Sequence, residues 1–228
     1  MKRLIVTLDG PAGSGKSTAA WRLAERLGVE MLDTGAMYRG LTAKALGRGI
    51  DIGEEPHAVV ELARSVGVRF DWTASPPRLL VGERDLTDRL RDPDVTSWVS
   101  DVSSMTAVRK VMVEAQRRIA EAHPRLVTEG RDQGSVVFPD ADAKFYLDAS
   151  PSIRAKRRAD QLRAAGKPVD LEQIREAIIL RDRKDATRQD GPLICPDDAE
   201  RIDTSEMELD EVVDLLEERV RSLVGVEV

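Results

Sequence analysis

The chain has 228 residues, of which 41% are hydrophobic, and a formal net charge of −6. This length leaves room for one α/β domain with an insertion or for two small domains, and the hydrophobic content is ordinary for a globular protein. No apolar run is long enough to span a bilayer, and the acidic balance argues against a general nucleic-acid or acidic-membrane surface. We therefore expect neither a nucleic-acid nor a membrane partner.

The reactive side chains are few. A single cysteine, Cys195, excludes an internal disulfide and is typical of a reducing compartment, so we expect a cytoplasmic protein. The histidines, His57 and His123, are far apart and lack cysteine neighbours, which disfavours a zinc site. The apolar run of residues 4–8 is too short for a signal peptide.

The first predicted unit is a strand at residues 4–8, a glycine-rich turn and a helix at residues 18–27. The turn reads GPAGSGKS from Gly10 to Ser17 and matches the phosphate-binding pattern G-x-x-x-x-G-K-[ST]. Its glycines let backbone N–H groups approach phosphate oxygens, and the helix start adds positive partial charge. Lys16 can reach β- and γ-phosphates, and the Ser17 hydroxyl can ligate Mg²⁺. The alternative is a structural glycine-rich turn.

The remainder alternates between strands and helices, with one interruption. Parallel-type strands are expected at residues 29–32, 126–129, 143–147 and 201–203, and helices at residues 36–46, 54–65, 93–100, 107–122, 151–165, 171–186 and 209–223. Residues 66–72, 78–83 and 85–87 indicate a small antiparallel meander. The pattern predicts an α/β fold: a doubly wound, central five-stranded parallel sheet with helices on both faces and a β-meander insert. No long heptad or apolar repeat is visible, which favours a monomer.

Polar motifs follow three of the predicted strands, at the sheet edge where such folds bind ligands. The first is the phosphate loop, the second reads DTGAMYR from Asp33, and the third reads GRD from Gly130. Arginines also occur in groups, at residues 154, 157 and 158 and at residues 181, 183 and 188. Such charges are usually solvated helix faces, but beside a phosphate loop they could also neutralise a polyanionic substrate.

With these motifs the chain resembles the bacterial cytidylate kinases of the nucleoside monophosphate kinase group. The matching segments are GPAGSGKST, LDTGAMYR, the spaced Ser100 and Arg109, EGRDQGSVVFPDA, FYLDA and RDRKDATR, in the order of that family and over nearly the whole chain. One departure is Gln133, where an apolar residue is expected. The resemblance implies a three-layer P-loop fold.

The resemblance also implies a division of the chain. Residues 1–35 and 101–228 would form the core kinase domain, with a mobile lid at about residues 151–168 whose turn lies at Gly166 to Pro168. Residues 36–100 would form a monophosphate-binding insert, with the meander at about residues 66–92. The implied reaction transfers the γ-phosphoryl group of ATP to CMP or dCMP with Mg²⁺.

The residues support this chemistry independently of the resemblance. Transfer to an alcohol usually needs a carboxylate base, whereas a nucleoside monophosphate already carries an anionic oxygen at neutral pH. The difficulty is then to bring two polyanions together, which calls for arginines, a lysine and Mg²⁺ rather than histidine.

Roles follow from the resemblance. The expected ATP-phosphate ligands are Gly10, Pro11, Ala12, Gly13, Ser14, Gly15, Lys16, Ser17 and Thr18, with Ser17 also the metal ligand. The expected acceptor contacts are Thr34, Tyr38, Arg39, Ser100, Arg109, Arg131, Asp132, Arg181, Asp185 and Arg188. Among these, Arg39, Arg131 and Arg188 would hold the acceptor phosphate, Ser100, Arg109 and Asp132 the cytosine edge, and Arg181 and Asp185 the ribose. The expected catalytic group is Lys16, Arg131, Arg157, Arg158 and Arg188, with Arg157 and Arg158 closing over the transferred phosphate.

Several of these residues have a structural alternative. Arg181 and Asp185, four residues apart, could form an ordinary helix salt bridge. Asp132 could cap a helix or pair with Arg131, and Tyr38 could be a core aromatic. Asp33 or Glu129 could orient a Mg²⁺-bound water, or serve as a structural hydrogen-bond partner.

Two other functions compete with a CMP/dCMP kinase. One is a related kinase for another monophosphate or an alcohol, which the lack of an obvious base disfavours. The other is a nucleotide-binding switch that signals to a partner, which would need no second pocket rich in arginines.

Overall fold

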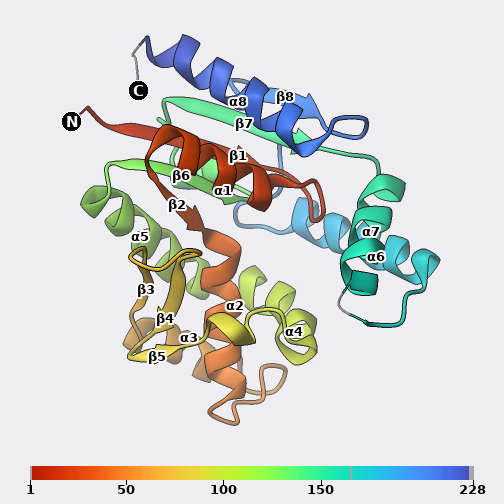
Figure 1. Cartoon of the computed structure of the whole chain (residues 1–228). Helices are drawn as coiled ribbons and strands as arrows, with labels where there is room; N and C mark the ends of the chain where they lie inside the picture. The colour runs from red at the N-terminus through yellow and green to blue at the C-terminus, as the bar shows by residue number, and fades with distance from the viewer. Residues whose placement is uncertain (1, 165, 226–228) are drawn as a thin grey trace. The chain divides into compact units, whose positions relative to one another are not determined.

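The computed structural model describes residues 2–164 and 166–225. The chain divides into two compact units. The core unit runs from the N-terminus to Leu32 and continues from Pro124 onward, and the insert unit is Asp33–His123. Figure 1 labels the helices and strands of both units.

A five-stranded sheet lies at the centre of the core unit, in the order β2-β6-β1-β7-β8. β1 pairs in parallel with β6 and β7, and β7 pairs in parallel with β8. All six residues of β1 are buried, as expected for a central strand of a sheet covered on both faces. The strands are β1 (Leu4–Asp9), β2 (Glu30–Asp33), β6 (Arg125–Gly130), β7 (Ala143–Asp148) and β8 (Glu200–Asp203). The predicted parallel α/β sheet is confirmed.

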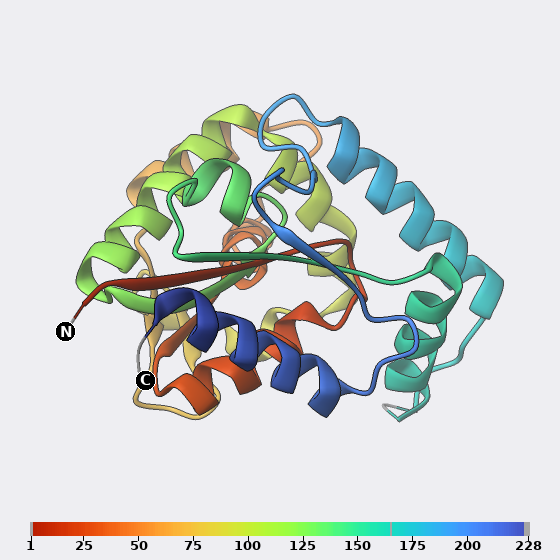
Figure 2. The ribbon, with the colours of Figure 1, turned by 90° about the horizontal axis from the view of Figure 1, so that it is seen from above.

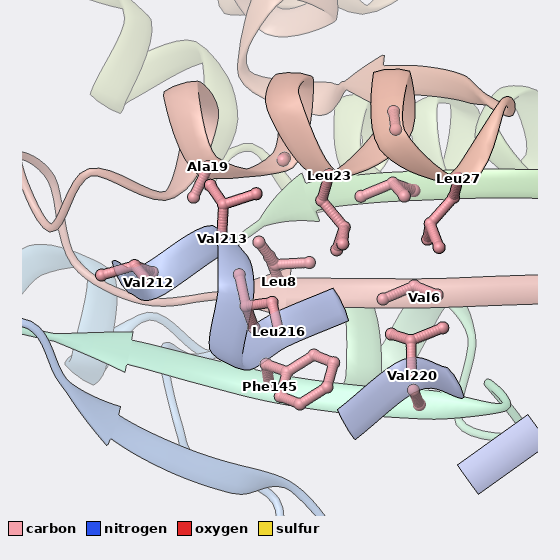
Figure 3. Close-up of a cluster of buried hydrophobic side chains, with 14 of the residues drawn as sticks. Val6, Leu8, Ala19, Leu23, Leu27, Phe145, Val212, Val213, Leu216 and Val220 are labelled. Carbon is pink, nitrogen blue, oxygen red and sulfur yellow. The ribbon is translucent and has the colours of Figure 1, made fainter. Parts of the chain in front are cut away.

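Two helices cover one face of this sheet, α1 (Lys16–Leu27) and α8 (Leu209–Val224). Each places apolar side chains at helical spacing toward the strands, and the two sets meet one another over Leu8 and Phe145 (Figure 3). The packed side chains in Figure 3 include Val6, Leu8, Ala19, Leu23, Leu27, Phe145, Val212, Val213, Leu216 and Val220. This apolar layer fixes the carboxyl end of β1, where the phosphate loop begins.

A helical pair, α6 (Pro151–Ala164) and α7 (Leu171–Thr187), completes the core unit together with a short helix. The two helices lie side by side (Figure 2). Asp170 caps α7 by accepting the N–H of Gln173 at 3.0 Å. The short helix, η2 (Gln133–Val137), was not predicted, because a distant carboxylate receives its first N–H groups, while Asp132 at the N-cap position makes no side-chain cap bond.

The insert unit holds four helices and a three-stranded antiparallel sheet, β3-β4-β5. Gly40 lets α2 approach β4, since a Cβ there would lie 2.4 Å from Leu79 Cδ2. The elements are α2 (Thr34–Leu46), α3 (Pro56–Ser65), β3 (Val68–Asp71), β4 (Arg78–Val81), β5 (Arg84–Asp85), the single turn η1 (Thr87–Arg89), α4 (Pro93–Ser104) and α5 (Thr106–Ala122). The predicted meander is confirmed.

The unit boundary differs from the expected one at residue 100. The helix α5 belongs to the insert unit by its contacts, because it packs on α3 and α4. α4 continues four residues past the predicted end at Ser100. Within residues 2–164 and 166–225, no helix combines the length and apolar character needed to cross a membrane.

Candidate active site

The turn between β1 and α1 is built by glycine. Gly13 and Gly15 have φ angles of 81° and 90°, which side-chain-bearing residues rarely adopt. A Cβ on Gly10 would lie 2.0 Å from the backbone oxygen of Leu147, so β7 closes against the loop. Gly15 is the N-cap of α1 and supplies no side-chain cap to the first N–H groups of that helix. The loop therefore has the backbone shape and the helix start of an anion site.

Two reactive side chains of the loop meet a carboxylate from β6. Lys16 is only 5% exposed, and its Nζ donates to Pro11 O at 3.1 Å and lies 3.7 Å from Glu129 Oε2. The Ser17 hydroxyl donates to Glu129 Oε1 at 2.8 Å. Glu129 thus orients both side chains that would face a bound polyphosphate.

Backbone oxygens of the loop are held by α6 and by the residue after β8. Arg154 donates to Ala12 O at 3.0 Å, and Arg157 donates to Ser14 O at 3.4 Å. Thr204 donates to Ser14 O at 3.1 Å and accepts from Arg157 at 3.1 Å. These contacts fix the loop from its outer side.

The arginines of α6 differ in their surroundings. Arg154 is buried and also pairs with Asp182 at 2.7 Å. Arg157 is half-buried against the loop, whereas Arg158 is exposed and donates to Gln161 at 3.4 Å. Sequence reasoning selected Arg157 and Arg158 and passed over Arg154, because spacing alone does not say which arginine is buried.

A second cluster, the arginine–carboxylate group, follows β6 and lines α7. Arg131 pairs with Asp185 at 2.9 Å, and Arg181 lies 4.0 Å from the same carboxylate. Arg188 lies 3.7 Å from Asp132. Planar guanidinium groups pair well with phosphate oxygens, so this set of three arginines is suited to an anionic ligand.

Electrostatics keep the Arg131–Asp185 pair ionised. Burial raises the pKa of Asp185, but the charges of Arg131, Arg181 and Arg188 outweigh it and hold the pKa below its usual value. Burial lowers the pKa of Arg131, and the neighbouring Asp185 and Glu129 more than restore it. The structure pairs Arg131 with Asp185 and places Asp132 beside Arg188.

The remaining predicted residues lie in the insert unit. Asp33 caps α2 by accepting the N–H of Ala36 at 2.7 Å and pairs with Arg39 at 2.8 Å. A Cβ on Gly35 would lie 2.8 Å from Arg39 Nη1, so this glycine makes room for the guanidinium. Thr34 is buried at the start of α2. The DTG motif therefore builds a helix start that holds an arginine.

Tyr38 and Arg109 form a buried polar contact inside the insert unit. Arg109 is 4% exposed, donates to the Tyr38 hydroxyl at 3.4 Å and lies over the ring, 6.0 Å from its centroid. Arg109 also donates to Ser103 O at 3.5 Å. Ser100 is half-buried on α4. Tyr38 is thus both a core aromatic and a hydrogen-bond partner of a predicted base-reading residue.

Three functional candidates were missed by sequence reasoning: Asp9, Arg154 and Thr204. Asp9 is fully buried and accepts the N–H groups of Gln133 and Gly134. Burial raises its pKa to about 7, against the lowering effect of those two N–H groups. The signal available in the sequence was a carboxylate at the end of a largely apolar strand.

The donor atoms near the loop fit a magnesium site that depends on substrate. Mg²⁺ prefers oxygen ligands and is usually bound by one or two protein groups together with waters and phosphates. Ser17 and Glu129 supply such oxygens side by side, whereas Asp33 is engaged by the start of α2 and by Arg39. Within the described part of the chain, no cluster of three or more His, Cys, Asp or Glu side chains could hold a metal alone.

Comparison with known proteins places the chain. The model of the cytidylate kinase family matches residues 6–222. A cytidylate kinase from Corynebacterium efficiens is 44% identical over 210 residues, which cover 92% of this chain and 91% of the relative. One from Exiguobacterium sibiricum is 43% identical over 218 residues, or 96% and 97% of the two chains.

A solved structure agrees at the level of the fold. An uncharacterized protein from Eubacterium ventriosum superimposes with a TM-score of 0.55 at 13% identity, over 97% of this chain and 99% of that one. This similarity concerns the fold alone, and the family is shown by the sequence comparisons. The chain belongs to the cytidylate kinase family.

Proposed function

We propose that the protein transfers the γ-phosphoryl group of ATP to CMP or dCMP, giving ADP and CDP or dCDP. The observation that carries the proposal is the presence, in one unit, of a phosphate loop and a separate group of three arginines. A protein that only binds or hydrolyses a nucleotide has no use for the second group. A kinase with a phosphorylated acceptor needs it.

The chemistry does not require a general base. The acceptor phosphate has a second pKa of about 6 and is largely dianionic at neutral pH, so its oxygen can attack directly. What the protein must supply is alignment and positive charge. In this proposal Lys16 holds the β- and γ-phosphates, and Arg131 and Arg188 hold the acceptor phosphate. Each arginine exchanges part of its contact with a carboxylate for a phosphate oxygen.

We propose Ser17 as the Mg²⁺ ligand and Glu129 as the group that orients a Mg²⁺-bound water. The hydrogen bond between these two side chains supports the pairing. The ion would neutralise charge on the transferred phosphoryl group.

The nucleoside part of the acceptor is assigned by chemistry. Asp132 is an acceptor suited to the exocyclic amine of cytosine, and Ser100 and Arg109 are proposed to contact the same base edge. Arg181 and Asp185 are proposed for the ribose hydroxyls, and Arg39 for the acceptor phosphate. Thr34 and Tyr38 would support these contacts from α2. A cytoplasmic location and a monomeric state also stay predictions.

The segment of about residues 151–168, which contains α6, is proposed to act as a lid. Arg157 already contacts Ser14 O, so a small movement would bring it to the phosphates of a bound nucleotide. Arg158 is exposed and would need a larger one. Residue 165 lies outside the described residues. Hydrogen exchange of residues 151–164 should slow with a bisubstrate analogue bound, and unchanged exchange would remove this role.

The test is ADP release measured with each nucleoside monophosphate in turn. We expect turnover with CMP and dCMP and little with AMP or GMP. Lys16→Ala should abolish it, while Lys110→Ala, a change at an exposed lysine of α5, should not. Turnover with another acceptor but not with CMP would contradict the proposal.

A further inference from the structure

A buried carboxylate joins the end of β1 to the start of η2. Asp9 is the last residue of β1 and is 1% exposed. Its Oδ1 accepts the N–H of Gln133 at 2.8 Å, and its Oδ2 accepts the N–H of Gly134 at 2.7 Å. Charge-assisted bonds of this kind are stronger than neutral ones, and a negative charge at a helix start is further stabilised. Asp9 therefore holds the first turn of η2 with both oxygens.

The contact joins two residues that are next in sequence to the two parts of the candidate site, the phosphate loop and the arginine–carboxylate group. Asp9 directly precedes Gly10 of the phosphate loop, and Gln133 directly follows Asp132 of the arginine–carboxylate group. Asp9 also lies opposite Gly130 in the β1–β6 register. A shift of η2 relative to β1 would therefore carry Asp132, and with it Arg131, away from the phosphate loop.

The surroundings leave little room for such a shift. A Cβ on Gly134 would lie 2.9 Å from Thr7 Oγ1 and 3.5 Å from Asp9 Oδ2. Thr128 donates to the side-chain oxygen of Gln133 at 2.8 Å. This contact also explains why Gln133 replaces the expected apolar residue, since its amide oxygen has a buried partner.

The phosphate loop has supports that do not involve Asp9. Arg154, Arg157 and Thr204 each donate to one of its backbone oxygens. Weakening the Asp9 contact should therefore disturb the loop less than it disturbs η2 and the residues before it.

We propose that Asp9 is a positioning residue for the phosphoryl acceptor, holding Arg131 and Asp132 in register with the phosphate loop through the N–H groups of Gln133 and Gly134. The inference rests on the proposed function. Asp9 does not touch the substrate in this account. It acts on the acceptor side through the backbone of η2.

Its ionisation gives the contact a pH dependence. The pKa of Asp9 is raised to about 7, mainly by burial and also by the charge of Asp132, against the lowering effect of the two N–H groups and of Lys16. The Cys195 thiol also feels the charge of Asp9, and the Lys144 side chain packs against Gly134. A protonated carboxyl loses its negative charge, and the oxygen that carries the proton becomes a weaker acceptor for a backbone N–H. The contact should therefore weaken as the pH falls through about 7.

The experiment measures KM for CMP and KM for ATP separately in Asp9→Asn. The amide keeps the size of the side chain but can accept only one of the two N–H groups. We expect KM for CMP to rise about tenfold and KM for ATP to change by less than about twofold. At high pH the wild-type protein should have a higher kcat/KM for CMP than Asp9→Asn. This difference should become smaller as the pH falls below about 7. A purely structural role would produce neither the split nor the pH dependence.

The matched control is Asp142→Asn. Asp142 accepts the N–H of Ile5 at 2.8 Å, which is the same type of bond on the same strand, near its opposite end. This variant should leave both KM values unchanged. An unchanged KM for CMP in Asp9→Asn, or equal increases in the two KM values, would overturn the inference.

A second pair of variants applies if Asp9→Asn does not fold. Gly134→Ala should raise KM for CMP by crowding Thr7 Oγ1, which has no hydrogen-bond partner within the described residues. Thr7→Ala in the same chain should restore it in part. A wild-type KM for CMP in Gly134→Ala would also overturn the inference. Failure of the wild-type protein to convert CMP would refute the proposed function instead.

Discussion

The phosphate loop and the arginine–carboxylate group are two candidate anion sites of different construction. The loop is a backbone structure, and its oxygens are held by Arg154, Arg157 and Thr204. The second group is made of side chains that neutralise one another, such as Arg131 with Asp185. A backbone site is ready before its ligand arrives, whereas paired side chains must exchange partners on binding. The first construction suits the donor that all reactions of the enzyme share, and the second suits selection of the acceptor.

The largest effect is expected where the loop meets the transferred phosphate. Lys16→Ala should remove about 3–4 kcal/mol of transition-state stabilisation, because one preorganised charge is lost at the β- and γ-phosphates. The variant should keep its fold and lose turnover equally with CMP and dCMP. Near-wild-type kcat at saturating ATP would show that the loop does not act as described.

The next prediction concerns Asp9, which connects the phosphate loop to η2. It predicts how the free energy of unfolding depends on pH. The pKa of Asp9 is raised from 3.8 in the unfolded chain to about 7 in the folded protein. Its contribution to stability is therefore complete below the unfolded value and is lost as the pH rises through about 7. Between pH 5 and pH 7 it should reduce the free energy of unfolding by up to about 2–3 kcal/mol.

The measurement is urea denaturation of wild type and Asp9→Asn across this pH range. The difference between the two proteins isolates Asp9 from the other titrating groups. Parallel curves for the two proteins would mean that Asp9 is already ionised well below pH 7.

Removing the contact by which α6 supports the phosphate loop should lower the free energy of unfolding. Arg154 and Asp182 are 4% and 21% exposed, and removing one partner leaves a largely buried charge. Arg154→Ala should lower the free energy of unfolding by about 2–3 kcal/mol. Arg158→Ala, four residues along the same helix and exposed, should change it by less than about 0.5 kcal/mol. Equal melting temperatures for the two variants would mean that Arg154 does not stabilise the phosphate loop.

Sequence reasoning succeeded where the chemistry is local. A buried apolar run followed by GPAGSGKS predicts strand, loop and helix with Lys16 and Ser17 in place, because adjacent residues make the whole structure. It also predicted the parallel sheet and the meander, because their strands have different patterns of hydrophobic residues. The pairing of Arg181 with Asp185 follows from helical spacing in the same way.

It failed where partners are distant in the chain. Asp9 contacts residues 124 and 125 positions away, and Thr204 contacts one 190 positions away. No local pattern carries such contacts, so η2 and the support of the loop were missed. For the same reason the ion pair between Arg131 and Asp185, 54 positions apart, was not predicted.

The smallest expected effect concerns the base rather than the phosphates. Cytosine presents an exocyclic amine where uracil presents a carbonyl oxygen, and an ionised carboxylate can only accept. If Asp132 reads this position, its preference for CMP over UMP should be worth about 1–3 kcal/mol. Asp132→Asn offers an amide donor to uracil at little steric cost and keeps the size of the side chain beside Arg188. The variant should lose kcat/KM for CMP far more than for UMP, since specificity is the ratio of these constants. An unchanged ratio would mean that Asp132 serves only as a partner of Arg188, and that selection of the base lies with Ser100 and Arg109.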